Sequence, residues 1–289
     1  MNYPEKIDLH MHTSVSDGTD TPEEILNRVR EEKIELFSVT DHDAVKGCVM
    51  IIDILKKGDP KFLTGAEFSC KDEDGQYHIL GYGYDPDSKA IRSVVKKGHG
   101  FRMSKVSRRL GYLAEQFGFE FRDEDLKELY DMDNPGKPHI GNLMVKYGYA
   151  ATKEEAITRY INKIHFKNSY IRPEEAIRGI IDAGGIPVLA HPSYGSGDQI
   201  IVGEEMEQRL EKLIGFGLQG VEAFYSGFTE KLQGEILKYS EKYGLYVTAG
   251  SDYHGKNKLV ELGDTNLKGT EEYPEGLKRF LNDIEGRIR

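Results

Sequence analysis

Short apolar runs alternate with helix-forming segments in the first third and the last 120 or so residues of the chain. We expect strands at residues 7–10, 36–40, 62–66, 77–82, 186–190, 220–223 and 246–249. The first helix is predicted to begin with Thr21 as N-cap, Pro22 in the first turn and Glu24 completing a capping box. Asp74-Gly75 is typical of a hairpin turn. Strands separated by helices predict an α/β fold with a parallel sheet that can close into a barrel.

The pattern changes between residues 88 and 168, where charged residues and helix formers dominate. Helices are predicted there at 88–118, 123–131, 138–148 and 152–163. The alternation of strands and helices then returns, with helices at 173–185, 204–216, 229–243 and 271–286. We interpret residues 87–167 as an all-helical insertion domain within an α/β domain formed by residues 1–86 and 168–289.

Composition narrows the class of protein. The chain has 289 residues and a formal net charge of -10, which argues against a protein that coats nucleic acid by bulk electrostatics. Its two cysteines, Cys48 and Cys70, cannot make a disulfide framework. We see no signal peptide and no apolar run long enough for a membrane span, so a cytoplasmic protein with no membrane partner is expected.

Polar residues follow several of the predicted strands. These residues are His10, His12, Asp41, His42, Glu67, His191, Asp252 and His254, and His78 lies within another strand. Residues two apart on an extended segment point to the same side, as His10 and His12 should. The carboxyl ends of parallel strands form one face of an α/β fold, and that face carries the chemistry.

Imidazole and carboxylate groups suit divalent Zn, Mn or Fe. A single His-x-His pair is often a surface coincidence, but its repetition at successive strand ends is not expected by chance. The sequence therefore predicts a site for several metal ions.

These motifs resemble the PHP (polymerase and histidinol phosphatase) superfamily. The matching segments are Asp8-Leu9-His10-Met11-His12-Thr13, Ser16-Asp17-Gly18, Thr40-Asp41-His42, Gly65-Ala66-Glu67, Ala190-His191-Pro192 and Gly250-Ser251-Asp252-Tyr253-His254. The resemblance implies a distorted (βα)7 TIM-like barrel that binds metals and hydrolyses phosphoesters. Lys137-Pro138-His139-Ile140 resembles a small bacterial group of nucleoside 3',5'-bisphosphate phosphatases and 5'-3' exoribonucleases.

The resemblance also implies a division of the metal ligands. His10, His12, Glu67 and Asp252 would hold a first ion and act in catalysis through it. Glu67 would bridge to a second ion bound by His78 and His191, and Asp17, His42 and His254 would hold a third. We expect two to three ions, with a hydroxide between two of them as the nucleophile.

Four residues around the ligands have more than one candidate role. Asp41 and Asp43 are candidates for orienting the histidines, although Asp43 could equally be a helix N-cap or first-turn acid. Tyr194 and Tyr225 could line the same pocket or be ordinary loop residues.

The predicted insertion supplies basic residues for substrate phosphate. They are Arg102, Lys105, Arg108, Arg109, Lys137 and His139. We favour Arg102 and His139, which resemble positions in the bacterial subgroup, and expect most of the others to form a solvated helix face. An insertion that covers the active site would favour nucleotides or strand ends over internal cuts.

The predicted function is metal-dependent hydrolysis of phosphoesters on nucleotides or short oligonucleotide ends, by a monomer. One alternative is a histidinol-phosphate-type phosphatase of a small metabolite. A second is an amidohydrolase, whose barrel also opens with His-x-His, and a third is an interaction module that keeps metals for stability.

Overall fold

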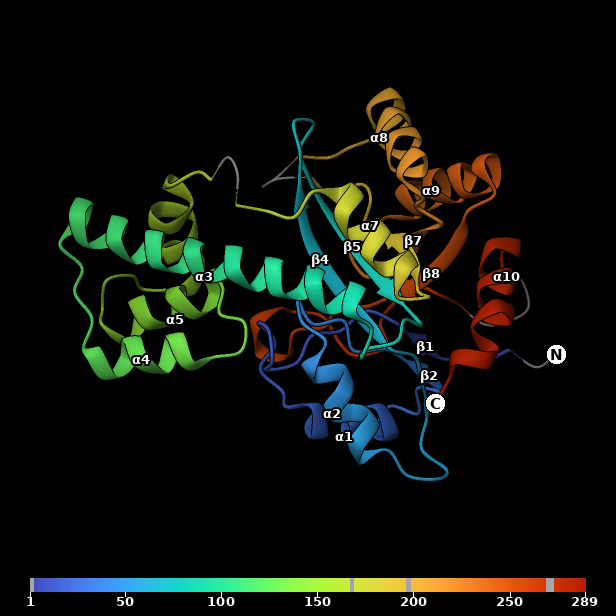
Figure 1. Cartoon of the computed structure of the whole chain (residues 1–289), viewed down its shortest axis with the longest axis horizontal. Coiled ribbons are helices and arrows are strands. Elements are labelled where there is room, and N and C mark those ends of the chain that lie inside the picture. The colour runs from blue at the N-terminus through green and yellow to red at the C-terminus, as the bar shows by residue number, and fades with distance from the viewer. Residues whose placement is uncertain (1–2, 167–168, 196–198, 269–272) are drawn as a thin grey trace.

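The computed structural model describes residues 3–166, 169–195, 199–268 and 273–289 (Figure 1). It has a mixed α/β fold with two sheets, as the alternating pattern predicted. The first sheet is parallel and contains β1 (Ile7–Asp8), β2 (Leu36–Phe37) and β3 (Lys61–Phe62). The second contains β4 (Gly65–Lys71), β5 (Gln76–Tyr82), β6 (Ile186–Leu189), β7 (Gly220–Tyr225) and β8 (Tyr246–Gly250).

The prediction of a parallel sheet is wrong for β5. This strand runs antiparallel to both of its neighbours, β4 and β6, while β6, β7 and β8 are parallel. The cause is the predicted hairpin, in which the Asp72 amide donates to the Gly75 carbonyl at 3.0 Å and reverses the chain. The single strand expected at 62–66 is divided between β3 and β4, and β1 and β2 are shorter than predicted.

Backbone contacts join the two sheets at both edges. On one side the Leu9 amide donates to the Ala249 carbonyl at 2.9 Å, which places β1 beside β8. On the other side a parallel bridge pairs His42 with Glu67 of β4. The candidate ligands of the first sheet are thereby brought next to those of the second.

Amphipathic helices pack around the sheets. They are α1 (Pro22–Glu31), α2 (Lys46–Ile54), α7 (Pro173–Asp182), α8 (Gly203–Phe216), α9 (Glu230–Tyr243) and α10 (Glu275–Ile284). Helix α1 has the predicted capping box between Thr21 and Glu24. The start predicted for the last helix, at residue 271, lies outside the described residues.

The remaining helices extend to one side of the sheets, on the left of Figure 1. They are α3 (Lys89–Phe117), α4 (Asp123–Asp131), α5 (Lys137–Lys146) and α6 (Lys153–Glu155). Ser88 caps the start of α3, and Gly118, with φ of 66°, ends it in the left-handed conformation that glycine favours. The helix expected at 152–163 is interrupted, because a π turn at Ala156–Tyr160 and a 3-10 turn at Ile161–Lys163 follow α6.

Within the described part of the chain, none of the helices has the length and apolar character needed to cross a membrane.

Candidate metal centre

Four of the predicted ligands, which lie within or just after three strands, come together. His10 and His12 follow β1, Glu67 lies in β4, and Asp252 follows β8. Both histidine Nε2 atoms face the same two oxygens. Glu67 Oε2 lies 3.4 Å from Nε2 of His10 and 3.2 Å from Nε2 of His12. Asp252 Oδ1 lies 3.4 Å from each of them.

These separations fit ligands of a shared ion. Two ligand atoms about 2.1 Å from one ion at tetrahedral angles lie about 3.4 Å apart. The Nε2 atoms of His10 and His12 are buried and have no hydrogen-bond partner among the described residues. Buried polar atoms normally have partners, so a divalent cation supplies what these atoms lack.

The second oxygen of Glu67 faces two further predicted ligands. Glu67 Oε1 lies 2.8 Å from Nδ1 of His78 in β5 and 3.3 Å from Nε2 of His191, which follows β6. Glu67 is only 1 % exposed, so its carboxylate is almost fully shielded from water. This arrangement suits a carboxylate that bridges two ions.

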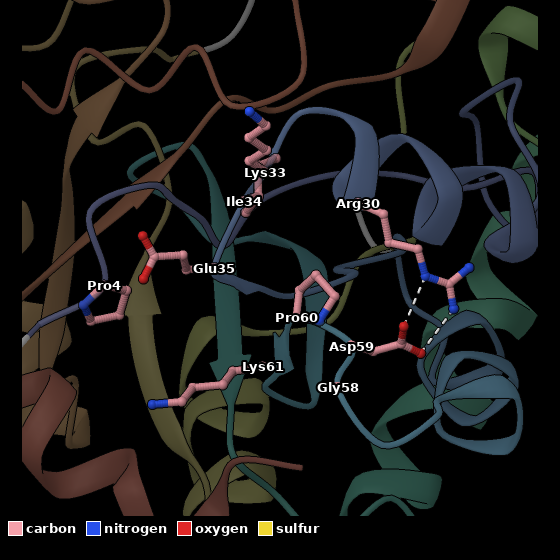
Figure 2. A pocket seen from close by; sticks show the side chains of 9 residues that line it. All are labelled: Pro4, Arg30, Lys33, Ile34, Glu35, Gly58, Asp59, Pro60 and Lys61. Carbon is pink, nitrogen blue, oxygen red and sulfur yellow. Dashed lines mark hydrogen bonds and ion pairs between the residues drawn. The ribbon is translucent and has the colours of Figure 1, made fainter.

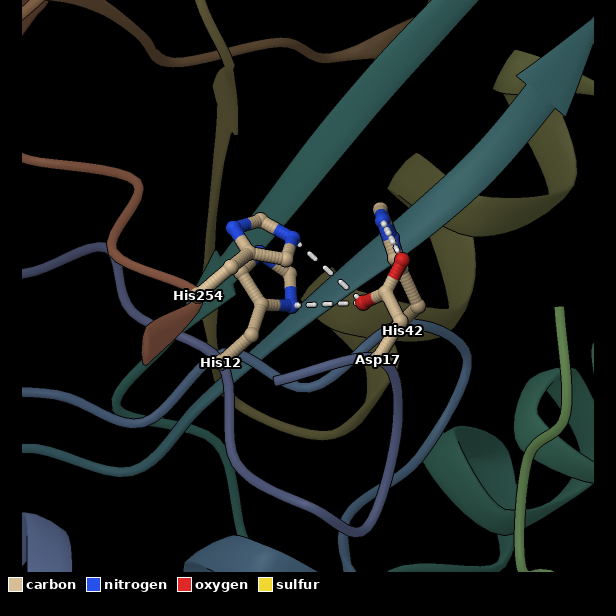
Figure 3. A group of neighbouring side chains, drawn as sticks. All are labelled: His12, Asp17, His42 and His254. Atoms are coloured by element: carbon tan, nitrogen blue, oxygen red, sulfur yellow. Dashed lines mark ion pairs between the residues drawn. The ribbon is translucent and has the colours of Figure 1, made fainter. Parts of the chain in front are cut away.

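A third group forms around Asp17 (Figure 3). Asp17 Oδ1 lies 3.4 Å from Nε2 of His254, and Oδ2 lies 3.8 Å from Nε2 of His42. His12 borders this group as well, with Nδ1 3.8 Å from Asp17 Oδ1. The nine residues predicted as ligands therefore gather in one connected cluster.

The electrostatics of the cluster favour bound cations. Burial would raise the pKa of the Glu67 and Asp17 carboxyls, but facing imidazoles hold each pKa well below its usual range. For the imidazole of His12 burial acts in the opposite direction and lowers the pKa. The neighbouring Asp252 and Glu67 outweigh this effect and raise the pKa of His12 to about 9. Each carboxylate is thus anionic and needs positive charge beside it, which divalent ions would supply more strongly than protons.

The cluster opens into a cleft of about 470 Å³. Glu67, His78 and Asp252 line its floor, while Lys153 and Ile157 come from the helical segment 87–167. Tyr194 and Tyr225 also line the cleft, which agrees with the hypothesis that these tyrosines are pocket residues.

A larger cleft of about 570 Å³ lies at the opposite, amino ends of β2 and β3 (Figure 2). Its Arg30 is already paired with Asp59 at 2.8 Å, and none of the predicted ligands lines it. The candidate ligands therefore lie at the smaller cleft.

A family model described as the PHP domain matches residues 8–172, which is more than half of the chain. The chain belongs to the PHP domain family. The match includes the ligand-bearing segments from His10 to His78. Membership of this family argues against the alternative that the chain is an amidohydrolase.

Curated relatives span nearly the whole chain. A 3',5'-nucleoside bisphosphate phosphatase from Chromobacterium violaceum is 26 % identical, and the alignment covers 98 % of this chain and 97 % of the relative. A 5'-3' exoribonuclease from Haemophilus influenzae is 25 % identical over 89 % of this chain and 93 % of its own. A phosphoribosyl 1,2-cyclic phosphate 1,2-diphosphodiesterase from Eggerthella lenta is 28 % identical, and the alignment covers 86 % of this chain and 94 % of the relative. This PHP chain is a hydrolase of phosphoester bonds.

Solved structures share the fold over its full length. A protein from Bifidobacterium adolescentis, named as a candidate metal-dependent phosphoesterase, superposes with a TM-score of 0.79, 26 % identity and 97 % coverage of both chains. A structure from Chromobacterium violaceum is described as an amidohydrolase with bound sulfate and no metal. It superposes with a TM-score of 0.82 at 24 % identity, and the match covers 98 % of this chain and 97 % of that chain. The latter likeness bears on the fold alone.

The two predicted phosphate contacts of this PHP chain, Arg102 and His139, are not among the residues that line the cleft. Arg102 on α3 is buried and pairs with Asp43 Oδ2 at 2.8 Å. His139 Nδ1 accepts a hydrogen bond from the Gly136 amide at 2.9 Å, which leaves Nε2 as the protonated nitrogen of the neutral ring.

The expectation of a solvated basic face on α3 is wrong for two residues. Lys105 is 7 % exposed and Arg109 is 5 % exposed, whereas Arg108 is exposed as expected. Lys105 Nζ lies 3.7 Å from the centre of the Tyr170 ring, and Arg109 stacks on Phe166 at 4.9 Å. The two cations are buried against aromatic rings because Phe166 and Tyr170 pack over this part of α3.

Asp41 and Asp43 have different roles. Asp41 accepts hydrogen bonds from the Thr13 amide at 2.8 Å and the Ser16 hydroxyl at 2.7 Å, and Ser16 Oγ lies 3.4 Å from His12 Nδ1. Asp41 therefore orders the loop that carries the ligands. Asp43 is not the N-cap of α2, because that helix starts at Lys46 with Val45 before it.

Two groups at the site were missed by the sequence reasoning. Glu222 in β7 is fully buried, and its Oε1 lies 2.9 Å from His10 Nδ1. Lys258 contacts Asp252 Oδ2, which also accepts from the Tyr225 hydroxyl at 3.0 Å. A signal for Glu222 was present, since an acidic residue inside the apolar run 220–225 is unusual.

The helical segment contacts the third ligand group directly. Asn134 donates to the His42 carbonyl. Lys153 Nζ donates to the Asn257 carbonyl at 3.0 Å, and Asn257 Nδ2 donates to the Asp17 carbonyl at 2.8 Å. The position of the helices and the geometry of this group are therefore linked.

Proposed function

We propose that this chain uses bound divalent metal ions to release phosphate from nucleotides or to trim short oligonucleotide ends. The observation that carries the proposal is the spacing of the buried donor atoms around Glu67 and Asp252, which matches shared ligands of an ion. Ions bound there supply Lewis-acid activation of a water molecule and neutralise the charge of the phosphate.

The ligands divide into three sites in this proposal. The first uses His10, His12, Glu67 and Asp252; the second uses Glu67, His78 and His191; the third uses Asp17, His42 and His254. What supports the division is that Glu67 directs one oxygen to the first pair of histidines and the other to His78 and His191. The first of these oxygens also lies 3.0 Å from His42 Nδ1, so the third site adjoins the first. Tyr225 and Lys258 hold the far oxygen of Asp252, so that its Oδ1 faces the histidines.

A nucleotide substrate is supported by the relatives and by the cations of α3. Arg102, Lys105 and Arg109 are spaced three and four residues apart and lie on one helix face. At 1.5 Å per residue the row extends about 10 Å away from the cluster. Lys105 and Arg109 have no carboxylate within ion-pair distance among the described residues. None of these cations lines the cleft, so in this proposal they contact a second phosphate of the substrate, beside Arg102 and His139, only when the covering Tyr170 and Phe166 rings move aside.

The proposal extends to the architecture. We place the active site at the mouth of a distorted (βα)7 barrel formed by residues 1–86 and 168–289, covered by an insertion at 87–167. The contacts of β1 with β8 and of His42 with Glu67 support closure of the barrel. A separate apolar cluster, which runs from Val106 to Ile161, supports the insertion as a unit with its own core.

The test is phosphate release by metal-loaded protein, with metal content measured on the same sample. The substrates are a nucleoside 3',5'-bisphosphate, a short 5'-phosphorylated RNA and histidinol phosphate. We expect turnover of the first two, and we expect the double variant His10→Ala/His12→Ala to fold but to have no activity.

Turnover of histidinol phosphate alone would favour the small-metabolite alternative over a nucleotide substrate. A fully metallated protein that hydrolysed none of the three would contradict the proposal and favour an interaction module.

A further inference from the structure

Glu222 is a buried carboxylate in which each oxygen contacts a nitrogen of a predicted metal ligand. Its Oε1 lies 2.9 Å from Nδ1 of His10, and its Oε2 accepts a hydrogen bond from the backbone amide of His191 at 2.9 Å. It is 0 % exposed and is not among the residues that line the cleft. No Lys or Arg pairs with it among the described residues, so its charge is offset through His10.

The local structure is built to admit this side chain. The pairing of β7 with β8 shifts register between Glu222 and Phe224, and such bulges redirect side chains beside active sites. A Cβ at Gly250 would lie 2.5 Å from Glu222 Oε1 and 2.2 Å from His10 Cβ. Only glycine lets β8 approach the carboxylate and the histidine at once.

The contact with His10 decides which nitrogen of that ring is available. A carboxylate accepts from an N–H, so Nδ1 carries a proton, and in the neutral ring that binds a metal ion the lone pair is on Nε2. That lone pair points to the side where Glu67 Oε2 and Asp252 Oδ1 lie, 3.4 Å away. The His10 ring therefore stands between Glu222 and the cluster, and Glu222 itself cannot reach a substrate in the cleft.

The contact with His191 fixes a strained backbone. His191 has φ of 28°, which is rare for a residue with a side chain. Its amide is held by Glu222 while its ring Nε2 lies 3.3 Å from Glu67 Oε1. One carboxylate thus orients a predicted ligand of the first ion and a predicted ligand of the second.

We propose that Glu222 is a positioning residue that sets the tautomer of His10 and the backbone of His191, and so links the first two metal sites. This inference rests on the proposed function for the identity of the sites. It concerns metal binding rather than turnover, so the two can fail separately.

The test uses the full-length variant Glu222→Gln. Glutamine keeps the shape but offers one acceptor oxygen to two donors, and its amide group would favour the His10 tautomer with the proton on Nε2. We expect zinc or manganese affinity, measured by competition with a chelator, to fall about 10- to 100-fold. Long-range nitrogen NMR of the zinc-loaded wild type should show His10 protonated at Nδ1.

A matched control is Thr64→Val, which removes another buried hydrogen bond, from Thr64 Oγ1 to the Tyr84 carbonyl at 2.8 Å. Its metal affinity should equal that of the wild type. Unchanged affinity in Glu222→Gln, or a wild-type His10 protonated at Nε2, would overturn the inference. If the wild type bound metal tightly but hydrolysed no phosphoester, the proposed function would fail while this result still stood.

Discussion

At the scale of single residues, the site is defined by which buried charges have partners. Glu67, Asp17 and Asp252 face imidazoles, whereas Lys105 faces an aromatic ring and other cations. Burying a charge without a partner is costly, so both kinds of residue indicate missing ligands. We therefore expect the carboxylates to bind cations and Lys105 to bind an anion.

Lys105→Met should weaken binding of a bisphosphate substrate. A hydrogen bond to a charged group contributes about 1.5–3 kcal/mol, so kcat/KM should fall about 10- to 100-fold. The exposed neighbour Arg108 is the control, and Arg108→Gln should change kcat/KM less than about twofold. Equal effects of the two substitutions would contradict a phosphate contact at Lys105.

The same residue predicts a pH dependence. Burial, reinforced by Arg102, lowers the pKa of Lys105 to about 7. Lys105 is therefore charged below that pH and loses its charge above it, so attraction for an anion declines as the pH rises. Arginine stays charged throughout this range. The inhibition constant of sulfate should rise more steeply above about pH 7 in the wild type than in Lys105→Arg, and parallel profiles would contradict this.

The candidate ligands could be predicted from the sequence because their spacing and residue types are local properties. All nine lie in the cluster, although their assignment to separate ions remains a prediction. The burial of Lys105 and the contacts of Glu222 could not be predicted. Both depend on segments more than 30 residues away that pack over them, namely Tyr170 on Lys105 and His191 on Glu222.

At the scale of elements, helices were easier to predict than strands. The bounds of α3 agree closely with expectation because Ser88 and Gly118 give chemical signals at its ends. β1 and β2 have two residues each, too few for a reliable alternation of polar and apolar positions. The turn at residues 72–75 sets the direction of β5. Asp74-Gly75 predicted this hairpin turn, and a hairpin makes its two strands antiparallel.

The packing of α4 on α5 yields a stability prediction. Lys146, Tyr147 and Arg122 lower the pKa of Asp125 from 3.8 to about 2. A carboxylate with a depressed pKa stabilises the fold fully above its unfolded value, and this contribution disappears as the pH falls through the folded value. Asp125→Asn should therefore lower Tm by a few degrees near pH 7.

The difference in Tm should shrink below about pH 4 and disappear only once the pH is below the folded pKa of about 2. Thermal denaturation of both proteins across this range is the measurement. Glu128→Gln, a neighbouring acidic residue on the same helix, serves as the control. A difference in Tm that is independent of pH would show that Asp125 acts through packing rather than charge.

At the scale of the whole molecule, two sheets and a helical segment converge on one cleft. The family match, the relatives and the fold agree on phosphoester hydrolysis. The net charge of -10 is consistent with this activity, because several of the acidic groups surround the candidate metal positions and would be offset by bound ions. A substrate phosphate would then meet bound cations rather than a bare acidic surface.

The central claim is that metal bound at this cluster drives hydrolysis of a nucleotide phosphoester. The most direct measurement begins with protein stripped of metal by a chelator and adds manganese in steps. Phosphate release from a nucleoside 3',5'-bisphosphate and bound metal are determined at each step. Activity should be absent at the start, rise with bound manganese and level off at two to three ions per chain, and His10→Ala/His12→Ala should stay inactive. Hydrolysis that persisted in the metal-free protein, or that did not follow bound metal, would contradict the account.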